Sequence, residues 1–200
     1  PSLVAPARNS PARWPTSISL LMKPGLGRMI FGNPALRPEH SRTWEAGVAW
    51  RGDASSLRLD AFSTDVDDLI AFDASLFLPN NIDRARLRGA ELEFDSTLAK
   101  WEIGFSASWL DTENRSVDNR GKDLPRRARQ TARLSIDRAF GAWRVGTTFI
   151  GEGARYDDVA NTRRLGGYAT LDLRGEYAFG DDWTVQAGVA NVFDRDYETA

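Results

Sequence analysis

Apolar and polar side chains alternate with a period of two residues from about residue 41 to the end of the chain. Side chains of a β-strand point to opposite faces in turn, so this period predicts strands with one apolar and one polar face. The clearest run places Trp101, Phe105 and Trp109 on one face and Glu102 and Ser106 on the other. Helical periodicity is absent. Eight runs are expected to be strands, at residues 41–51, 57–65, 84–94, 100–110, 127–137, 143–149, 169–177 and 183–189.

The third run changes phase in its middle. Ala85 and Leu87 belong to one phase, and the apolar residues after Gly89 belong to the other. A glycine at such a point suits a β-bulge, which inserts one residue and redirects the side chains that follow. We therefore predict a bulge at Gly89, which would leave Arg86 on the same polar face as Glu91.

The expected links between the strands alternate in length. Short links fall at residues 52–56, 95–99, 138–142 and 180–182, and long polar links at 67–83, 111–125 and 151–166. Short turns on one edge and long loops on the other are typical of an up-and-down β-barrel in a bacterial outer membrane, with the long loops outside the cell. The pattern therefore predicts an all-β fold, with about eight antiparallel transmembrane strands.

Tryptophans stand at both ends of the expected strands, as the two interfaces of a bilayer favour. Four lie beside short links and two beside long links: Trp50, Trp101, Trp143 and Trp183, then Trp44 and Trp109. Charges at mid-bilayer cost roughly 2 to 4 kcal/mol for each Arg or Lys, so the charged face is expected to line the lumen. The apolar face, which carries the tryptophans, is expected to contact lipid.

Composition narrows the class of protein further. The 26 basic and 28 acidic residues give a net charge of −2, which disfavours nucleic-acid binding through phosphate neutralisation. There is no cysteine, so thiolate metal sites are excluded. Residues 1–31 are rich in proline, carry no acidic residue and stay unassigned, and we interpret them as a mis-framed start.

Segments around the expected strands resemble the TonB-dependent outer-membrane receptors. Residues 32–41 (GNPALRPEHS) and 191–198 (NVFDRDYE) are similar to two motifs that this family carries before late strands. Three further segments resemble the vitamin B12 (cobalamin) receptors in particular, at residues 81–91 (NIDRARLRGAE), 124–130 (LPRRARQ) and 155–157 (RYD). The resemblance covers residues 32–200 and lacks the family's plug domain and final strand.

The resemblance implies the C-terminal part of a 22-stranded barrel that takes up vitamin B12 or another corrinoid. In such receptors the TonB complex supplies energy through the N-terminal plug, and lipid and lipopolysaccharide surround the barrel. No enzyme activity and no cofactor are expected. A ferric siderophore or haem receptor shares this mechanism and is the nearest alternative, a passive porin-like barrel is another, and a soluble enzyme on a β-sandwich is a third.

Arg126 and Arg127 are the candidate substrate-binding residues. They follow Pro125 at the extracellular end of an expected strand. A guanidinium there can donate to amide or phosphate groups of a corrinoid. The alternative is that they pair with acidic neighbours. Glu91 and Glu93 with Arg129 and Arg133 are interpreted as a ladder of charges facing the lumen.

The remaining motif residues are interpreted as structural. They are Asn33, Pro34, Pro38, Glu39, Gly89, Glu91, Asn191, Phe193, Asp194 and Tyr197. Phe193 and Tyr197 are expected to anchor at the outer interface, and Asn191 and Asp194 to hold backbone groups of their loop. No metal site is assigned, although the carboxylates at 65–68 and 157–158 are of the type that binds calcium. His40 is the sole histidine, so no catalytic triad is expected.

Overall fold

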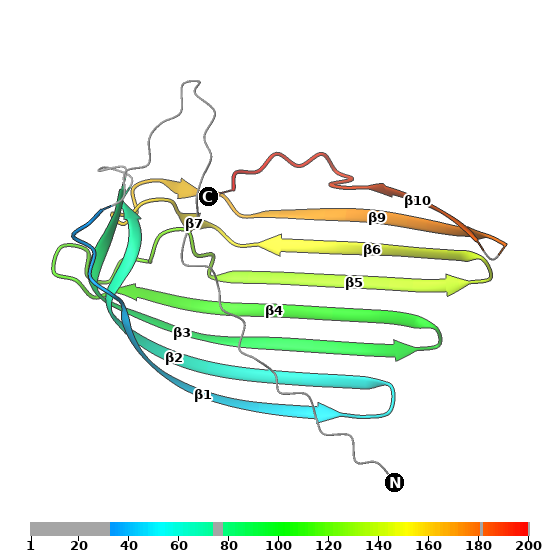
Figure 1. Ribbon diagram of the computed structural model, residues 1–200, viewed down its shortest axis with the longest axis horizontal. Coiled ribbons are helices and arrows are strands. Elements are labelled where there is room, and N and C mark those ends of the chain that lie inside the picture. The colour runs from blue at the N-terminus through cyan, green and yellow to red at the C-terminus, as the bar shows by residue number, and fades with distance from the viewer. Residues whose placement is uncertain (1–32, 74–77, 181, 200) are drawn as a thin grey trace, which may run out of the picture. The chain divides into compact units, whose positions relative to one another are not determined.

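The computed structural model describes residues 33–73, 78–180 and 182–199, so the interpretation of residues 1–31 lies outside the described part. Eight antiparallel strands form one curved sheet in the order β1-β2-β3-β4-β5-β6-β9-β10 (Figure 1). Their bounds are β1 His40–Arg51, β2 Ser55–Asp73, β3 Leu78–Leu98, β4 Trp101–Asn114, β5 Gln130–Phe140, β6 Trp143–Glu152, β9 Tyr168–Phe179 and β10 Trp183–Val189. A two-stranded hairpin, β7 Arg155–Tyr156 with β8 Arg164–Leu165, lies within the connection between β6 and β9.

All eight predicted strands are confirmed, and the differences lie mainly at their outer ends, where β4 continues to Asn114 and β6 to Glu152. The predicted loop at 67–83 is wrong, because pairing of β2 with β3 continues to Asp73 and Leu78. Leu69 and Ile82 are partners in this extension and both are buried, so apolar contact stabilises the longer hairpin. The fifth strand begins at Gln130 and not at residue 127, because the preceding residues turn toward the neighbouring loop.

Most large apolar side chains lie on the outer surface of the sheet. Trp44 and Trp183 are each 75% exposed. The buried hydrophobic residues of the described part are few: Val66, Leu69, Ile82, Ala85, Leu124 and Leu165. A water-soluble sheet would bury its aromatic face, whereas a sheet that contacts lipid leaves it outside. In the described part there is no helix long and apolar enough to cross a membrane.

The tilt of the strands can be calculated from the positions of the tryptophans at the short turns. Successive strand partners connect Trp50 in β1 to Phe105 in β4, and Trp101 lies four residues closer to the short turns than Phe105 does. The same series of partners continues to Phe149 in β6, and Trp143 lies six residues closer to the short turns than Phe149 does. Six residues span about 20 Å along the strands and five strand spacings about 24 Å across them. If these tryptophans share one membrane interface, the strands tilt by about 40°, as in outer-membrane barrels.

Gly89 does not form the predicted bulge. The register between β2 and β3 and between β3 and β4 runs through Gly89 without a shift. Glycine is needed there for a different reason, since a Cβ would lie 2.7 Å from the Phe62 ring and 2.6 Å from the Trp109 carbonyl oxygen. The aromatic ring of the partner strand occupies the space that a side chain would take.

The faces of β3 therefore differ from the prediction at its outer end. Ala85 and Leu87 lie on the inner face with Glu91, and Arg86 lies on the outer face opposite Asp65. The prediction assumed that apolar residues always face lipid, but here the inner face is covered by loops that bury Ala85. The backbone irregularity lies further along, at Asp68, whose φ is 57°.

Replacement of Gly89 by alanine is expected to destabilise the folded sheet by about 1 to 3 kcal/mol, because the added methyl group overlaps backbone as well as the Phe62 ring. Gly175 is the control, since a Cβ there meets nothing within 4 Å and the Gly175→Ala variant should unfold as the parent does. The measurement is the urea midpoint of the detergent-solubilised receptor. Equal midpoints for the two variants would show that the overlap is relieved at no cost.

Candidate functional site at the long-loop end

The segment 33–39 is fastened along the extended β2–β3 hairpin. Asn33 and Pro34 open a turn in which the Asn33 side chain accepts from the Ala35 amide at 3.0 Å and donates to the Pro79 carbonyl at 3.1 Å. A proline fixes φ at the second position of such turns. Further along, Glu39 accepts from the Ile70 amide. These contacts hold the segment 33–39 against the hairpin.

A small apolar cluster lies beneath the long loops on the inner face. Val66, Leu69, Ile82, Ala85 and Leu124 form its buried centre. Leu124 is 0% exposed and its amide donates to the Thr112 hydroxyl at 3.0 Å. The β4–β5 loop therefore packs against the inner face of the sheet and does not extend into solvent.

Asn161 connects the two long loops to each other. Its side-chain oxygen accepts from the Asp123 amide at 2.8 Å and its Nδ2 donates to the Asp123 carbonyl at 2.9 Å. Asn161 has a φ of 56°, a left-handed conformation that asparagine tolerates better than most residues. This pair of hydrogen bonds makes the β4–β5 and β6–β9 connections one unit.

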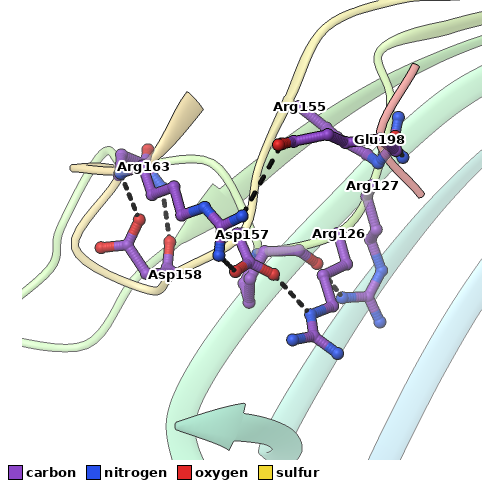
Figure 2. Close-up of polar contacts among 9 residues, drawn as sticks. Arg126, Arg127, Arg155, Asp157, Asp158, Arg163 and Glu198 are labelled. Atoms are coloured by element: carbon purple, nitrogen blue, oxygen red, sulfur yellow. Dashed lines mark hydrogen bonds and ion pairs between the residues drawn. The ribbon is translucent and has the colours of Figure 1, made fainter. Parts of the chain in front are cut away.

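Arg126 belongs to a charged network between these loops that is centred on Asp157 (Figure 2). The Nε of Arg126 donates to Asp157 at 2.9 Å, and Arg163 donates to the second oxygen of Asp157 at 3.1 Å. Asp157 is 8% exposed, so its carboxylate requires such partners. The Arg126 guanidinium also stands 5.1 Å from the centre of the Phe72 ring. The pairing with an acidic neighbour that the sequence left open is therefore present, while 41% of the Arg126 side chain stays exposed.

Arg127, drawn next to Arg126 in Figure 2, is more buried than Arg126. Burial lowers the pKa of its guanidinium, and Glu39 acts in the opposite direction by raising it. Its Nη1 is 3.5 Å from the Pro125 carbonyl oxygen, at the limit of a hydrogen bond. A half-buried guanidinium of this kind can donate to an anionic or carbonyl oxygen.

The last described residues bind to the same loop. Arg155 donates to the Glu198 carbonyl at 2.8 Å, and Arg163 reaches the Glu198 carboxylate at 3.7 Å. The rings of Tyr168 and Tyr197 stack with centroids 4.2 Å apart. Tyr197 is therefore held by protein contacts, in addition to the interface role predicted for it.

The motif at 191–198 is closed by its asparagine. Asn191 donates to the Arg195 carbonyl at 3.0 Å and accepts from the Arg195 amide at 3.0 Å. The amide of Asp194 donates to the Asn191 carbonyl at 2.8 Å. Asn191 thus holds backbone groups as expected, Asp194 contributes its own backbone, and Phe193 is 74% exposed.

Asp158 closes the tip of the β6–β9 connection. Its carboxylate accepts from the amides of Thr162 and Arg163 at 2.9 and 2.8 Å and from the Thr162 hydroxyl at 2.9 Å. Burial alone would raise the pKa of Asp158, but these hydrogen bonds outweigh it and the pKa is lowered. The ionised carboxylate therefore stabilises the loop.

The inner face of the sheet carries charges on its membrane-spanning part as well. Arg174 pairs with Asp137 and donates to the Thr148 hydroxyl at 2.7 Å, and Arg144 pairs with Glu102. Asp137, Arg144 and Arg174 border a hollow of about 610 Å³ in the wall near the short turns. The inner face is thus hydrophilic, as predicted.

The predicted ladder of charges is confirmed in part. Glu91, Glu93 and Arg133 lie on the inner face by register. Arg129 does not join them, because it precedes β5 and pairs with Asp123 in its own loop at 2.7 Å.

The clustered aspartates have arginine or backbone partners. Asp65 accepts from Arg86 at 2.8 Å, and Asp68 pairs with Arg37 at 2.6 Å. Within the described residues no group of three or more His, Cys, Asp or Glu side chains is placed to hold a metal ion.

Comparison with known proteins identifies the family. Residues 15–192 match the family described as TonB dependent receptor-like, beta-barrel, and the chain belongs to this family. The match begins within the residues that the alternating pattern leaves unassigned. Members of the family are bacterial outer-membrane proteins and are not enzymes, in agreement with the expected location and class.

Individual relatives agree with this assignment. The vitamin B12 transporter BtuB of Photobacterium profundum is 30% identical over 173 residues, which cover 83% of this chain and 28% of that protein. Among solved structures, the ferric yersiniabactin uptake receptor FyuA of Yersinia pestis has a TM-score of 0.72 at 25% identity, covering 80% of this chain and 26% of that one. The siderophore receptor PiuA of Acinetobacter baumannii has a TM-score of 0.69 at 22% identity, covering 78% and 25%.

The sequence did not identify Asp157 as the acidic partner of Arg126, or Glu198 as a partner of Arg163. These partners are separated by 31 and 35 residues, so no local spacing signals them. The Asn161–Asp123 link is equally remote at 38 residues. An asparagine in the middle of a polar loop is the only hint that the sequence offers.

Replacement of Asp158 by alanine should increase amide hydrogen exchange at Thr162 and Arg163 by about 10- to 100-fold, since each amide loses a hydrogen bond to a charged acceptor. Asp53→Ala, at an exposed short turn, is the control and should leave this loop unchanged. Exchange measured by mass spectrometry on the detergent-solubilised receptor checks the prediction. Unaltered protection in the Asp158 variant would contradict it.

The same loop should respond to acid in a defined direction. Because the folded-state pKa of Asp158 is lowered below its ordinary 3.8, its contribution is complete above that value and is lost as the pH falls through the folded pKa. Protection of the Thr162 amide, corrected for intrinsic exchange, should be equal at pH 7 and pH 5 and should fall only below about pH 4. Loss of protection already between pH 7 and pH 5 would assign it to another group.

Proposed function

We propose that this chain forms part of the barrel wall of an outer-membrane transporter that takes up vitamin B12 or a related corrinoid. The observation that supports this substrate is the 30% identity to the vitamin B12 transporter, which extends over 83% of the chain. The chain spans only about a quarter of its relatives' lengths, so the activity concerns the assembled receptor. Uptake of this kind needs a binding site and an energy supply, and no covalent chemistry.

The two edge strands of the described sheet indicate what the complete barrel requires. β1 and β10 each pair on one side only within that sheet. In hydrocarbon an unpaired strand edge is costly, so each requires a further strand. A tilt near 40° with about one residue of offset per strand is compatible with a barrel of about 22 strands. A plug inside it would meet the charges of the inner wall and would transmit the action of the TonB complex.

Arg126 is the residue we propose for substrate contact, with Arg127 as a weaker candidate. The ion pair with Asp157 uses the Nε of Arg126 and fixes the side chain at the loop surface. A guanidinium that is already oriented loses less entropy when it donates to an amide or phosphate oxygen of a corrinoid. Arg127, half-buried nearby, offers a second donor group.

A ferric chelate is the second candidate substrate. The similarity to the ferric yersiniabactin receptor, at a TM-score of 0.72 and 25% identity, supports it. Arginines at the loops suit an anionic siderophore as well as a corrinoid, so the side chains described above do not separate the two candidates.

An uptake assay on the assembled receptor distinguishes the two candidate substrates. Cells that depend on this receptor should accumulate radiolabelled cyanocobalamin and should lose this ability when the TonB complex is deleted. Accumulation of a ferric siderophore without cobalamin would favour the second candidate. Uptake that continues without the TonB complex would indicate a passive pore.

The role of Arg126 has its own test. Arg126→Ala is expected to weaken cyanocobalamin binding about 10- to 100-fold through loss of a charged donor. Arg120→Ala, an exposed arginine of the same loop, is the control and should bind as the parent does. Asp157→Ala should weaken binding less than Arg126→Ala, because it leaves the guanidinium in place. Equal affinity of the Arg126 and Arg120 variants, measured by titration, would exclude contact with the substrate.

A further inference from the structure

A small polar pocket lies at the outer end of the β2–β3 hairpin, beside the end of β4. Its volume is about 230 Å³, and Val159 of the β6–β9 connection contributes to its lining. Its polar surface comes from Asn80, Asn81, Asp83, Asn114, Asp118 and Asn119. Arg126, Arg127 and Asp157 do not line it, so the pocket is separate from the charged network described above.

Asn114 lines this pocket with a buried amide nitrogen that has no partner. The residue is 0% exposed, and its Oδ1 accepts from the Ser116 amide at 2.9 Å. A backbone amide can only donate, so the oxygen of Asn114 must face Ser116 and the nitrogen must face away from it. This Nδ2 is buried and makes no hydrogen bond. A buried donor without a partner costs free energy unless a ligand accepts from it.

Two further asparagines of the pocket have engaged oxygens. The Asn80 oxygen accepts from the Asn81 amide at 3.0 Å. The Asn119 oxygen accepts from the Lys122 ammonium at 3.0 Å. In each side chain the other polar atom is Nδ2, which only donates. The lining therefore contains three amide groups that require acceptor atoms.

Two carboxylates add the opposite requirement at the rim. Asp83 lies 3.5 Å from Arg37, and both Asp83 and Asp118 are exposed residues. A metal cation has no acceptor to offer the amide groups, and a phosphate would be repelled by the carboxylates. A hydroxyl group both donates and accepts, so a neutral ligand with several hydroxyl groups satisfies both kinds of partner.

The remaining wall of the pocket is aliphatic. Ile82 is 7% exposed, and Ala71 and Val159 pack against the same apolar cluster. A sugar ring carries C–H bonds between its hydroxyl groups, so it can contact this wall and the polar side chains together. The volume is below the roughly 300 to 1,000 Å³ of pockets for drug-sized ligands, which favours a single ring.

We propose that this pocket binds a monosaccharide, whose hydroxyl groups accept from Asn80, Asn114 and Asn119 and donate to Asp118. The site is additional to the one that recognises the transported substrate. A dissociation constant on the order of 1 mM is expected for a ligand of about twelve non-hydrogen atoms.

Saturation-transfer NMR on the intact receptor tests the proposal, with D-glucose, D-galactose and D-mannose as probes. The detergent is lauryldimethylamine oxide, which has no sugar headgroup. Asp118→Ala is expected to weaken binding about 10-fold, because a hydroxyl group loses a charged acceptor. Asn114→Ala should weaken it about 5-fold through loss of the buried donor. Val117→Ala, in the same loop and 89% exposed, is the control and should bind as the parent does.

The Asp118 variant protects the test from a folding defect, because Asp118 is exposed whereas Asn114 also holds the turn at Ser116. The expected result is transfer to at least one sugar that Ca²⁺, inorganic phosphate and cyanocobalamin do not displace. Displacement by an ion would assign the pocket to that ion, and displacement by cyanocobalamin would assign it to the transported substrate.

Three further outcomes would overturn the proposal. They are absence of transfer to all three sugars, equal affinity of the Asp118 and Val117 variants, and transfer to cyclohexanol as strong as to the sugars. Cyclohexanol has a six-membered ring with one hydroxyl group, so equal transfer would show that the aliphatic wall alone causes binding.

Discussion

A backbone amide or carbonyl in hydrocarbon has no water to bind, so each one must find its partner within the protein. The eight strands satisfy this requirement by pairing each with the next over long, uninterrupted registers. The same constraint fixes which side chains face outward, because an unshifted register keeps every second residue on one side. The outer apolar face, the hydrophilic inner wall and the position of the loops all follow from it.

This constraint no longer applies where the strands leave the membrane. There Asp68, Arg126, Asn161 and Asn191 adopt left-handed backbone conformations, and side chains replace strand pairing as the source of partners. The contacts of Arg126 with Asp157 and of Asn161 with Asp123 join two loops. Arg155 and Arg163 connect Glu198, near the end of the described chain, to the same surface. The wall of strands provides the rigid support on which these loop side chains are held.

The strands could be predicted from the sequence because alternation is a local property. The prediction failed where an assumption about the environment failed, since Ala85 and Leu87 are apolar yet face inward beneath Leu124. Gly89 was correctly singled out, but for the wrong reason, because the ring that excludes a side chain belongs to Phe62 on another strand. The partners of Arg126 could not be predicted for a similar reason, because they come from a loop that lies near Arg126 only in the folded chain.

Spin labels distinguish the lipid-facing side from the lumen side most directly. In the intact receptor in bilayers, labels at Phe105 and Leu171 should be accessible to oxygen and protected from a water-soluble nickel reagent. Labels at Ser106 and Thr170, their neighbours in sequence on the inner face, should show a smaller ratio of oxygen to nickel accessibility. Strong nickel accessibility at Phe105 and Leu171 would contradict the orientation of the sheet, and with it the assignment of the inner wall.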